Sequence, residues 1–185
     1  MRKLSLILVA GISLVGAGVG LAQTPKASAN ATQALGPLRP DQARFRSVYK
    51  ELVETNTSLS VGSCTEAAAK MQAHLAAAGY PTADLHPFVA PDHPKEGGLV
   101  AVLPGTDPRA KPLLLLAHLD VVEAKRADWQ RDPFTLVEEG GYFYGRGSVD
   151  DKAMAATWVD TMMRLKEQHV GLKRTIKRLT RNEVG

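Results

Sequence analysis

The stretch that decides the fold runs from Leu113 to Lys152. It begins Leu113-Leu114-Leu115-Leu116-Ala117-His118-Leu119-Asp120 and ends Tyr144-Gly145-Arg146-Gly147-Ser148-Val149-Asp150-Asp151-Lys152. A short apolar run bounded by a proline and by polar residues predicts a β-strand that is buried on both faces. Side chains two residues apart on an extended chain point the same way, so we expect His118 and Asp120 to project together beyond one edge of the sheet. Open α/β sheets place their functional sites at that edge.

Two more features follow this pair in the chain. The segment Trp129-Gln130-Arg131-Asp132-Pro133-Phe134 lies between the predicted strand and a glycine-flanked turn, and the turn leads directly into an amphipathic helix. A single His-x-Asp is a weak signal, because a hydrogen-bonded structural pair has the same sequence. For Trp129 and Phe134 we accept the simpler interpretation, in which buried aromatic side chains hold a loop in place and take no part in chemistry. The order of the three motifs is the more specific signal.

Together these motifs resemble those of the co-catalytic zinc exopeptidases, a family that includes aminoacylases, carboxypeptidase G-type enzymes, succinyl-diaminopimelate desuccinylase and cytosolic dipeptidases. The family pattern is His-x-Asp at a strand end, an intervening Trp and Asp-Pro-Phe, and then Gly-Arg-Gly-x-x-Asp-x-Lys. The resemblance covers the chain in order from Asp41 to Thr180. It implies a zinc-dependent hydrolase of the metallopeptidase, carboxypeptidase or aminoacylase type, whose substrates are short peptides or N-acyl amino acids with a free carboxylate.

The resemblance also implies roles for three residues. His118 would be a ligand of one zinc ion, Asp150 the carboxylate that bridges two zinc ions, and Asp120 the catalytic-site acid that orients the His118 imidazole. A zinc-bound imidazole usually has its other ring nitrogen held by a carboxylate or a carbonyl, and two neighbouring metal ions need an anion between them. In the family, the peptide bond after the bridging Asp is often cis. A carboxylate at a helix start is also a common helix cap, which is the alternative interpretation of Asp150.

The end of the chain departs from the family pattern. The family has Glu-Glu after the strand expected at Lys173–Thr180, the first as general base and the second as a zinc ligand, whereas Glu183 stands alone here. Glu183 can be the catalytic base or the ligand, but not both. The resemblance further calls for another carboxylate ligand, a second histidine ligand, and a lid domain with the dimerisation contact. We therefore expect a truncated or frameshifted family member, inactive as given and with at most a partial zinc site. The alternatives are a catalytically dead remnant and a non-enzymatic exported binding module.

Helical and extended patterns alternate along the chain. The apolar spacing predicts helices at Asp41–Glu54, with Asp41 as N-cap, at Thr65–Ala78, ended by Gly79, and from Asp150 or Asp151 to a point before Gly171. Strands are predicted at Ala83–Val89, Gly98–Leu103, Pro112–Ala117 and Lys173–Thr180. This order indicates an α/β fold with a mixed sheet and flanking helices, the incomplete N-terminal part of a zinc exopeptidase catalytic domain. Exposed edge strands in such a sheet lead us to expect aggregation or marginal stability.

The first 22 residues have the pattern of an export signal. Arg2-Lys3 form the basic region, Leu4–Val19 the apolar region, and Gly20-Leu21-Ala22 a cleavage site with small residues. A transmembrane anchor is the alternative, because the apolar region is nearly long enough to span a bilayer. We expect removal of residues 1–22 and export to the periplasm. Residues 23–40 are predicted to be a linker, and residues 41–185 a partial metallopeptidase catalytic domain.

The composition sets further limits. With 44% hydrophobic and 23% charged residues the chain is typical of globular proteins. The formal net charge is +4, but Arg2 and Lys3 belong to the expected signal peptide, and the chain has no motif of a nucleic-acid-binding module. We expect no nucleic-acid partner, no membrane contact after signal removal, and no dimerisation domain. The single cysteine, Cys64, excludes an intrachain disulfide, and we interpret its thiol as structural or incidental.

Overall fold

The structure is a computed structural model, and it describes residues 37–181. The helices are α1 (Pro40–Glu54), α2 (Cys64–Ala77) and α3 (Lys152–Glu167), and short 3-10 turns lie at η2 (Thr82–Asp84) and η3 (Arg126–Asp128). The strands are β1 (Leu85–Ala90), β2 (His93–Leu103), β3 (Leu113–His118), β4 (Val137–Glu139), β5 (Tyr142–Tyr144) and β6 (Ile176–Arg181). The expected signal peptide, nearly all of the expected linker, and Glu183 lie outside the described residues.

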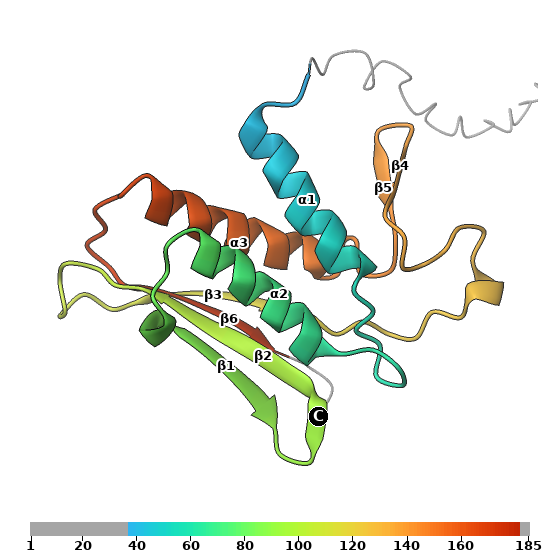
Figure 1. The fold of residues 1–185 in the computed structure, drawn as a ribbon, viewed down its shortest axis with the longest axis horizontal. Coiled ribbons are helices and arrows are strands. Elements are labelled where there is room, and N and C mark those ends of the chain that lie inside the picture. Colours follow the sequence, from blue (N-terminus) through green and yellow to red (C-terminus); the bar gives the residue numbers. More distant parts are fainter. Residues whose placement is uncertain (1–36, 182–185) are drawn as a thin grey trace, which may run out of the picture.

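The larger sheet is mixed, as the sequence predicts. Its strand order is β1-β2-β6-β3, and β4 and β5 form a separate hairpin (Figure 1). The pairs β1–β2 and β2–β6 are antiparallel, whereas β3 runs parallel to β6. A parallel pair needs a crossover connection, and here α3 supplies it between β3 and β6. The prediction of an α/β fold with a mixed sheet and helices outside it is confirmed.

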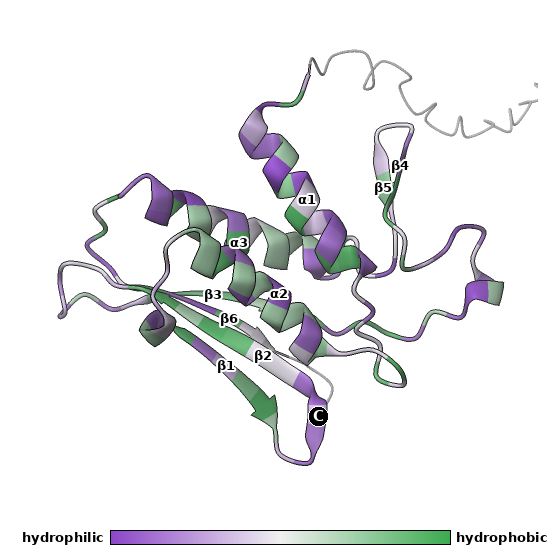
Figure 2. Ribbon diagram, viewed as in Figure 1, coloured by the Kyte–Doolittle hydropathy of each residue, from purple (hydrophilic) through white to green (hydrophobic). Residues whose placement is uncertain are grey.

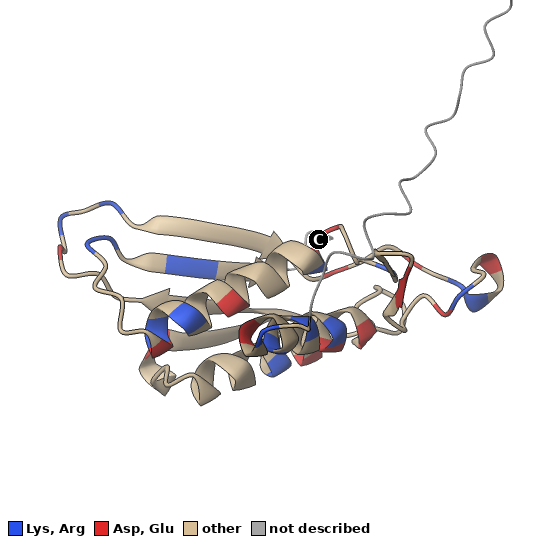
Figure 3. Cartoon of the chain, turned by 90° about the horizontal axis from the view of Figure 1, so that it is seen from above, with Lys and Arg blue, Asp and Glu red and all other residues tan. Residues whose placement is uncertain are grey.

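The hydrophobic core lies between the helices and one face of this sheet. The alternation of side chains along the strands sends one set of residues inward, and these are buried against α2 and α3. The inward set from the strands comprises Leu85, Leu99, Ala101, Leu103, Leu115, Ala117 and Ile176. Figure 2 shows hydrophobic colour along the strands of the sheet and on the helices that cover it. Charged residues gather mainly on the helices and loops (Figure 3).

The prediction that strand Pro112–Ala117 is buried on both faces is wrong. In β3 the side chains of Leu115 and Ala117 are buried, but those of Leu114 and Leu116 are 56% and 51% exposed. The reason is that, in the described part of the chain, the helices pack against one face of the sheet and α3 covers that face of β3 (Figure 1). From Leu114 to Ala117 the side chains therefore alternate between surface and core, as in a half-buried strand, and Leu113 at the start of the strand is exposed as well.

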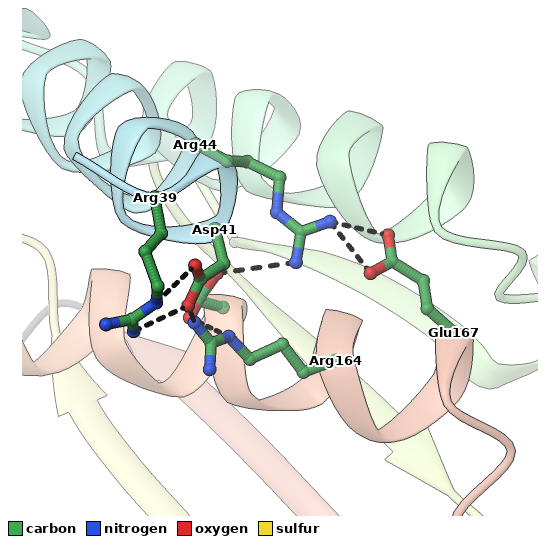
Figure 4. A network of polar contacts seen from close by, with 6 residues as sticks. Arg39, Asp41, Arg44, Arg164 and Glu167 are labelled. Carbon is green, nitrogen blue, oxygen red and sulfur yellow. Dashed lines mark hydrogen bonds and ion pairs between the residues drawn. The ribbon is translucent and has the colours of Figure 1, made fainter. Parts of the chain in front are cut away.

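The start of α1 differs from the prediction by one residue. The helix begins at Pro40 with Arg39 in the N-cap position, so Asp41 is not the N-cap. A proline suits the first helical position because that residue needs no N–H partner there and its φ is already helical. Asp41 instead lies in the first turn, where its carboxylate accepts hydrogen bonds from Arg39 at 3.1 Å and pairs with Arg164 of α3 (Figure 4).

This contact is part of a network of charged side chains that joins α1 to α3. Arg44 of α1 donates to both carboxylate oxygens of Glu167 at 2.7 and 2.8 Å, and its other nitrogen lies 3.6 Å from Asp160 (Figure 4). Arg39 and Arg164 hold the pKa of Asp41 at about 2, below its usual value of 3.8. The first and last described helices are therefore held together by ionic contacts in addition to apolar packing.

Helix α2 both begins and ends one residue before its predicted bounds, Thr65–Ala78. Ser63 is its N-cap and accepts a hydrogen bond from the Glu66 N–H at 3.1 Å, so that Cys64 is the first helical residue. Gly79 follows the C-cap with φ +93°, a conformation that glycine adopts at no steric cost. The Cys64 side chain is buried, and this burial raises the pKa of its thiol to about 12. Within the described residues, none of the helices is both long and apolar enough to cross a membrane.

Candidate metal centre

His118 and Asp150 meet at the carboxyl end of β3. His118 is the last residue of that strand, and Asp150 lies in the turn that precedes α3. The His118 Nε2 atom is 2.9 Å from the Asp150 Oδ1 atom. The two residues are separated by 32 positions in the chain. The structure thus brings together the two side chains that the sequence motifs single out as metal ligands, while the role of ligand stays a prediction.

Asp120 lies on the other side of the His118 ring. Its backbone carbonyl oxygen is 3.1 Å from the His118 Nδ1 atom, and its Oδ1 atom is 3.4 Å from the same nitrogen. Asp120 is buried, whereas the Asp150 side chain is 87% exposed. Both ring nitrogens face oxygen atoms in the structure, since Nε2 lies 2.9 Å from Asp150 Oδ1. If Nε2 bound a metal, the oxygen beside Nδ1 would accept the remaining ring proton. This is the arrangement expected if Asp120 orients the imidazole, although here the backbone oxygen is nearer than the carboxylate.

The turn that carries Asp150 has a specific backbone shape. Gly147 has φ +76°, and a Cβ atom at this position would lie 2.6 Å from Cγ1 of Val121. The peptide bond between Asp150 and Asp151 is cis, as is often the case in the family that the motifs resemble. Asp151 occupies the N-cap position of α3, so the interpretation of Asp150 as the helix cap is wrong. Glycine is required at position 147, because the turn passes close to Val121 in the segment that follows β3.

Hydrogen bonds from other elements hold this turn in place. The Tyr49 hydroxyl of α1 donates to the Ser148 carbonyl at 2.7 Å, and the Arg146 N–H donates to the Pro133 carbonyl at 2.6 Å. The Lys152 ammonium is buried and donates to the Thr55 carbonyl at 2.7 Å. Burial lowers the pKa of Lys152 to about 8. The sequence motif contains Arg146 and Lys152, but these tertiary contacts could not be derived from it.

A cavity of about 570 Å³ opens beside the pair of His118 and Asp150. Its walls come from two stretches of the chain, the segment after β3 and the turn before α3. The lining residues are His118, Asp120, Val121, Val122, Gly145, Arg146, Gly147, Ser148, Val149 and Asp150. The cavity is therefore lined by His118 and Asp150, the two candidate metal ligands, together with Asp120, Arg146 and three valines.

The donor set fits zinc in part. An imidazole nitrogen and a carboxylate oxygen are both common zinc ligands, and catalytic zinc normally has three protein ligands. Within residues 37–181, no group of three or more His, Cys, Asp or Glu side chains is arranged to hold a metal ion. His118 and Asp150 thus fit two positions of a zinc site. Glu183, predicted as the base or a further ligand, lies outside the described residues.

Trp129 and Phe134 are half-buried, and the expectation of buried aromatic residues is wrong for both. The Arg146 guanidinium carbon lies 4.9 Å from the centroid of the Trp129 ring, in a cation–π contact. Trp129 therefore contacts the turn of the candidate centre directly. In the sequence, the segment that contains Trp129 lies between His118 and Asp150. This position in the motif order was the signal that Trp129 would lie near the centre.

Comparison with known proteins finds relatives of this chain. Residues 114–180 match the sequence profile of the peptidase family M20/M25/M40. The chain is 38% identical over 73 residues to the human N-fatty-acyl-amino acid synthase/hydrolase PM20D1, covering 40% of this chain and 14% of the relative. It is 39% identical over 83 residues to aminoacylase-1 of Sus scrofa, covering 43% of this chain and 20% of the relative.

Solved structures show the same fold. Human carnosine dipeptidase 1 superimposes with a TM-score of 0.57 at 25% identity, over 75% of this chain and 31% of its own. The M20 family metallo-carboxypeptidase Sso-CP2 from Sulfolobus solfataricus has a TM-score of 0.63 at 19% identity, over 79% of this chain and 31% of its own. The described fold corresponds to part of an M20 peptidase catalytic domain.

These matches define the class of protein: the chain is related to peptidases and aminoacylases, which are hydrolases that act on amide bonds. Residues 114–180 fit the M20 family of metallopeptidases and aminoacylases, so the resemblance seen in the motifs of this stretch is confirmed. It spans a fifth or less of the length of the two curated relatives and about a third of the two solved structures.

Proposed function

We propose that the protein is a zinc-dependent hydrolase that cleaves the amide C–N bond of short peptides or N-acyl amino acids. The observation that carries the proposal is the convergence of His118 Nε2 and Asp150 Oδ1 at 2.9 Å on the wall of a cavity. The relatives support the substrate class, since they include an aminoacylase, a hydrolase of N-fatty-acyl amino acids and a dipeptidase. Because the chain spans only part of these relatives, the activity is assigned here as a proposal.

Each residue of the centre has a task in this reaction. When bound, zinc supplies a Lewis acid that polarises the scissile carbonyl and lowers the pKa of water. His118 and Asp150 would hold zinc, and with the metal bound at Nε2 the Asp120 oxygen beside Nδ1 would accept the remaining ring proton of His118. Glu183 is proposed as the base that removes a proton from the attacking water, or as a further ligand. Export to the periplasm after removal of residues 1–22 is proposed on the basic, apolar and small-residue pattern of that segment.

The experiment is a calorimetric titration of the purified chain with zinc. We expect His118→Ala and Asp150→Ala to weaken zinc binding at least tenfold, since each removes a ligand. The matched control is His86→Ala, because His86 is an exposed histidine on β1, away from the cavity. Equal zinc affinity in the His118 variant and the control would refute the assignment of the centre.

The same preparations test activity on N-acetyl-methionine and on carnosine. Turnover above a metal blank that His118→Ala abolishes would support the hydrolase. A non-enzymatic zinc-binding module is the alternative candidate that this assay distinguishes from a hydrolase. That candidate predicts zinc binding lost in His118→Ala together with no turnover in any variant.

A further inference from the structure

We propose that Thr57, in the loop between α1 and α2, is a positioning residue of the candidate metal centre. It holds residues 119–121, the segment whose middle residue, Asp120, lies against the His118 ring. This role rests on the proposed hydrolase function, because the position of the ring matters for chemistry only if His118 binds a metal. Thr57 lies outside the sequence motifs that contain the candidate ligands.

Two hydrogen bonds join Thr57 to the chain on either side of Asp120. The Thr57 hydroxyl donates to the Leu119 carbonyl at 2.6 Å, and the Val121 N–H donates to the Thr57 carbonyl at 3.3 Å. Thr57 and Leu119 are both buried, so water is not at hand to replace the hydroxyl if it is removed. The segment is therefore fixed immediately before and immediately after Asp120.

The second of these bonds sets the direction of the oxygen that lies nearest to His118. The Asp120 carbonyl and the Val121 N–H belong to one planar trans peptide unit, in which they point in opposite directions. Thr57 accepts the N–H on one side of this unit, and the Asp120 oxygen lies 3.1 Å from His118 Nδ1 on the other. Thr57 thus reaches the His118 ring through a single peptide unit.

The loop itself is closed by short contacts around Thr57. The Ser58 N–H donates to Asn56 Oδ1 at 2.9 Å, and the Gly62 N–H donates to the Ser58 carbonyl at 2.8 Å. A Cβ atom at Gly62 would lie 2.6 Å from Cα of Thr57, so the two sides of the loop are packed directly against each other. Such a loop is a firm support for the segment that Thr57 holds.

The same loop also contacts the other half of the candidate centre. The Lys152 ammonium donates to the Thr55 carbonyl at 2.7 Å, and Lys152 follows Asp150 by two residues at the start of α3. Residues 55–57 therefore contact both the segment that carries Asp120 and the turn that carries Asp150. A change at Thr57 should move the first half of the centre relative to the second.

The test uses Thr57→Val, which removes the hydroxyl and keeps the shape of the side chain. The full chain is titrated with zinc by calorimetry, and the ring C–H signals of His118 are recorded by NMR in the metal-free protein. We expect zinc to bind about tenfold more weakly, the lower end of the loss seen when a group that orients a metal-bound imidazole is replaced. The His118 ring signals should shift, and Thr57→Ser should restore both properties because it keeps the hydroxyl.

Thr180→Val is the matched control. Thr180 is also buried, and its hydroxyl donates to a backbone carbonyl, that of Leu99 at 3.3 Å, but this bond joins β6 to β2. The control should therefore keep the zinc affinity of the wild type. Wild-type affinity in Thr57→Val, an equal loss in Thr180→Val, or a loss that Thr57→Ser does not restore would overturn the proposal.

A second contact between the loop and the segment after β3 serves if Thr57→Val does not fold. The Ser60 N–H and hydroxyl each donate to the Glu123 carboxylate at 2.9 Å, on the surface. Glu123→Ala removes this contact, whereas Glu123→Gln loses the same charge and keeps an oxygen that can accept. We expect weaker zinc binding and a larger shift of the His118 signals in the alanine variant, and equal results for both would overturn the positioning role of the loop.

The two readouts separate this proposal from the hydrolase assignment. Zinc affinity that His118→Ala leaves unaltered would refute the metal centre, while a shift of the His118 ring signals in Thr57→Val would still support the contact through Asp120. Zinc binding that depends on His118, with both readouts of Thr57→Val as in the wild type, would refute the role of Thr57 alone.

Discussion

Arg178 is the buried charge in the core whose replacement should have the largest effect on stability. It lies in β6 between Ala101 of β2 and Leu115 of β3, and its side chain enters the core with 0% exposure. Its Nη2 atom donates to the Ala155 carbonyl at 3.3 Å, whereas Nε and Nη1 have no hydrogen-bond partner among the described residues. Burial lowers the pKa of this guanidinium to about 9, which reflects the cost of keeping its charge away from water. We expect Arg178→Met to stabilise the protein.

The size of the effect follows from these contacts. Each buried donor without a partner costs about 1–3 kcal/mol, and the variant loses one hydrogen bond worth about 1 kcal/mol. Methionine follows the path of the arginine stem and fills irregular space because it is unbranched. The net gain should be about 2–4 kcal/mol, in the range found when buried ionic groups are replaced by apolar residues of similar size.

Urea unfolding followed by circular dichroism measures this gain. With a slope of about 1–3 kcal/mol/M for a small protein, the midpoint should rise by about 1–3 M. Lys177→Met is the matched control, because Lys177 is the neighbouring residue of β6, is exposed, and receives the same side chain. The control should change the stability by less than about 0.5 kcal/mol. An unchanged or lower midpoint in Arg178→Met, or an equal rise in the control, would refute the assignment of Arg178 as an uncompensated buried charge.

Two further predictions concern the ionic contact between α1 and α3 and the turn of the candidate centre. The folded pKa of Asp41 is about 2 and its ordinary value is 3.8, so the stability from its ion pairs is present above pH 4 and is lost as the pH falls from about 4 to about 2. In Asp41→Asn this part of the acid dependence of the unfolding free energy should be absent, and an identical acid profile in both proteins would contradict it. Gly147→Ala should unfold at a lower temperature than Gly140→Ala, with about 1–3 kcal/mol more destabilisation from overpacking. Both glycines have positive φ, but of the two only Gly147 is close to other atoms. A Cβ at Gly147 would lie 2.6 Å from Cγ1 of Val121, whereas a Cβ at Gly140 would have nothing within 4 Å. Equal melting temperatures of the two variants would therefore argue against this close approach.

Much of the fold follows from local sequence patterns. The ends of α2 were predictable to within one residue, because Gly79 adopts the positive φ that stops a helix. The strand before His118 was equally clear, since an apolar run next to a proline is extended in most contexts. The burial of β3 was not predictable from the run itself. A run of leucines has the same sequence whether helices cover one face of its sheet or both, and the packing of the helices decides which face is buried.

For the candidate centre, too, one part could be predicted from the sequence and another part depended on the tertiary structure. The sequence by itself singled out the residues that we predict to carry the chemistry, His118, Asp120 and Asp150, because they stand in motifs of defined spacing. Neighbours along a strand or a turn keep their relation in any fold. Only the tertiary structure decided that His118 and Asp150 lie 2.9 Å apart, that Trp129 covers Arg146, and that Arg178 points into the core. These relations join positions far apart in the chain, and they depend on how α3 packs against the sheet after the crossover. Local backbone preferences act over a few residues, whereas packing selects one arrangement of the elements through the apolar surface that they bury together.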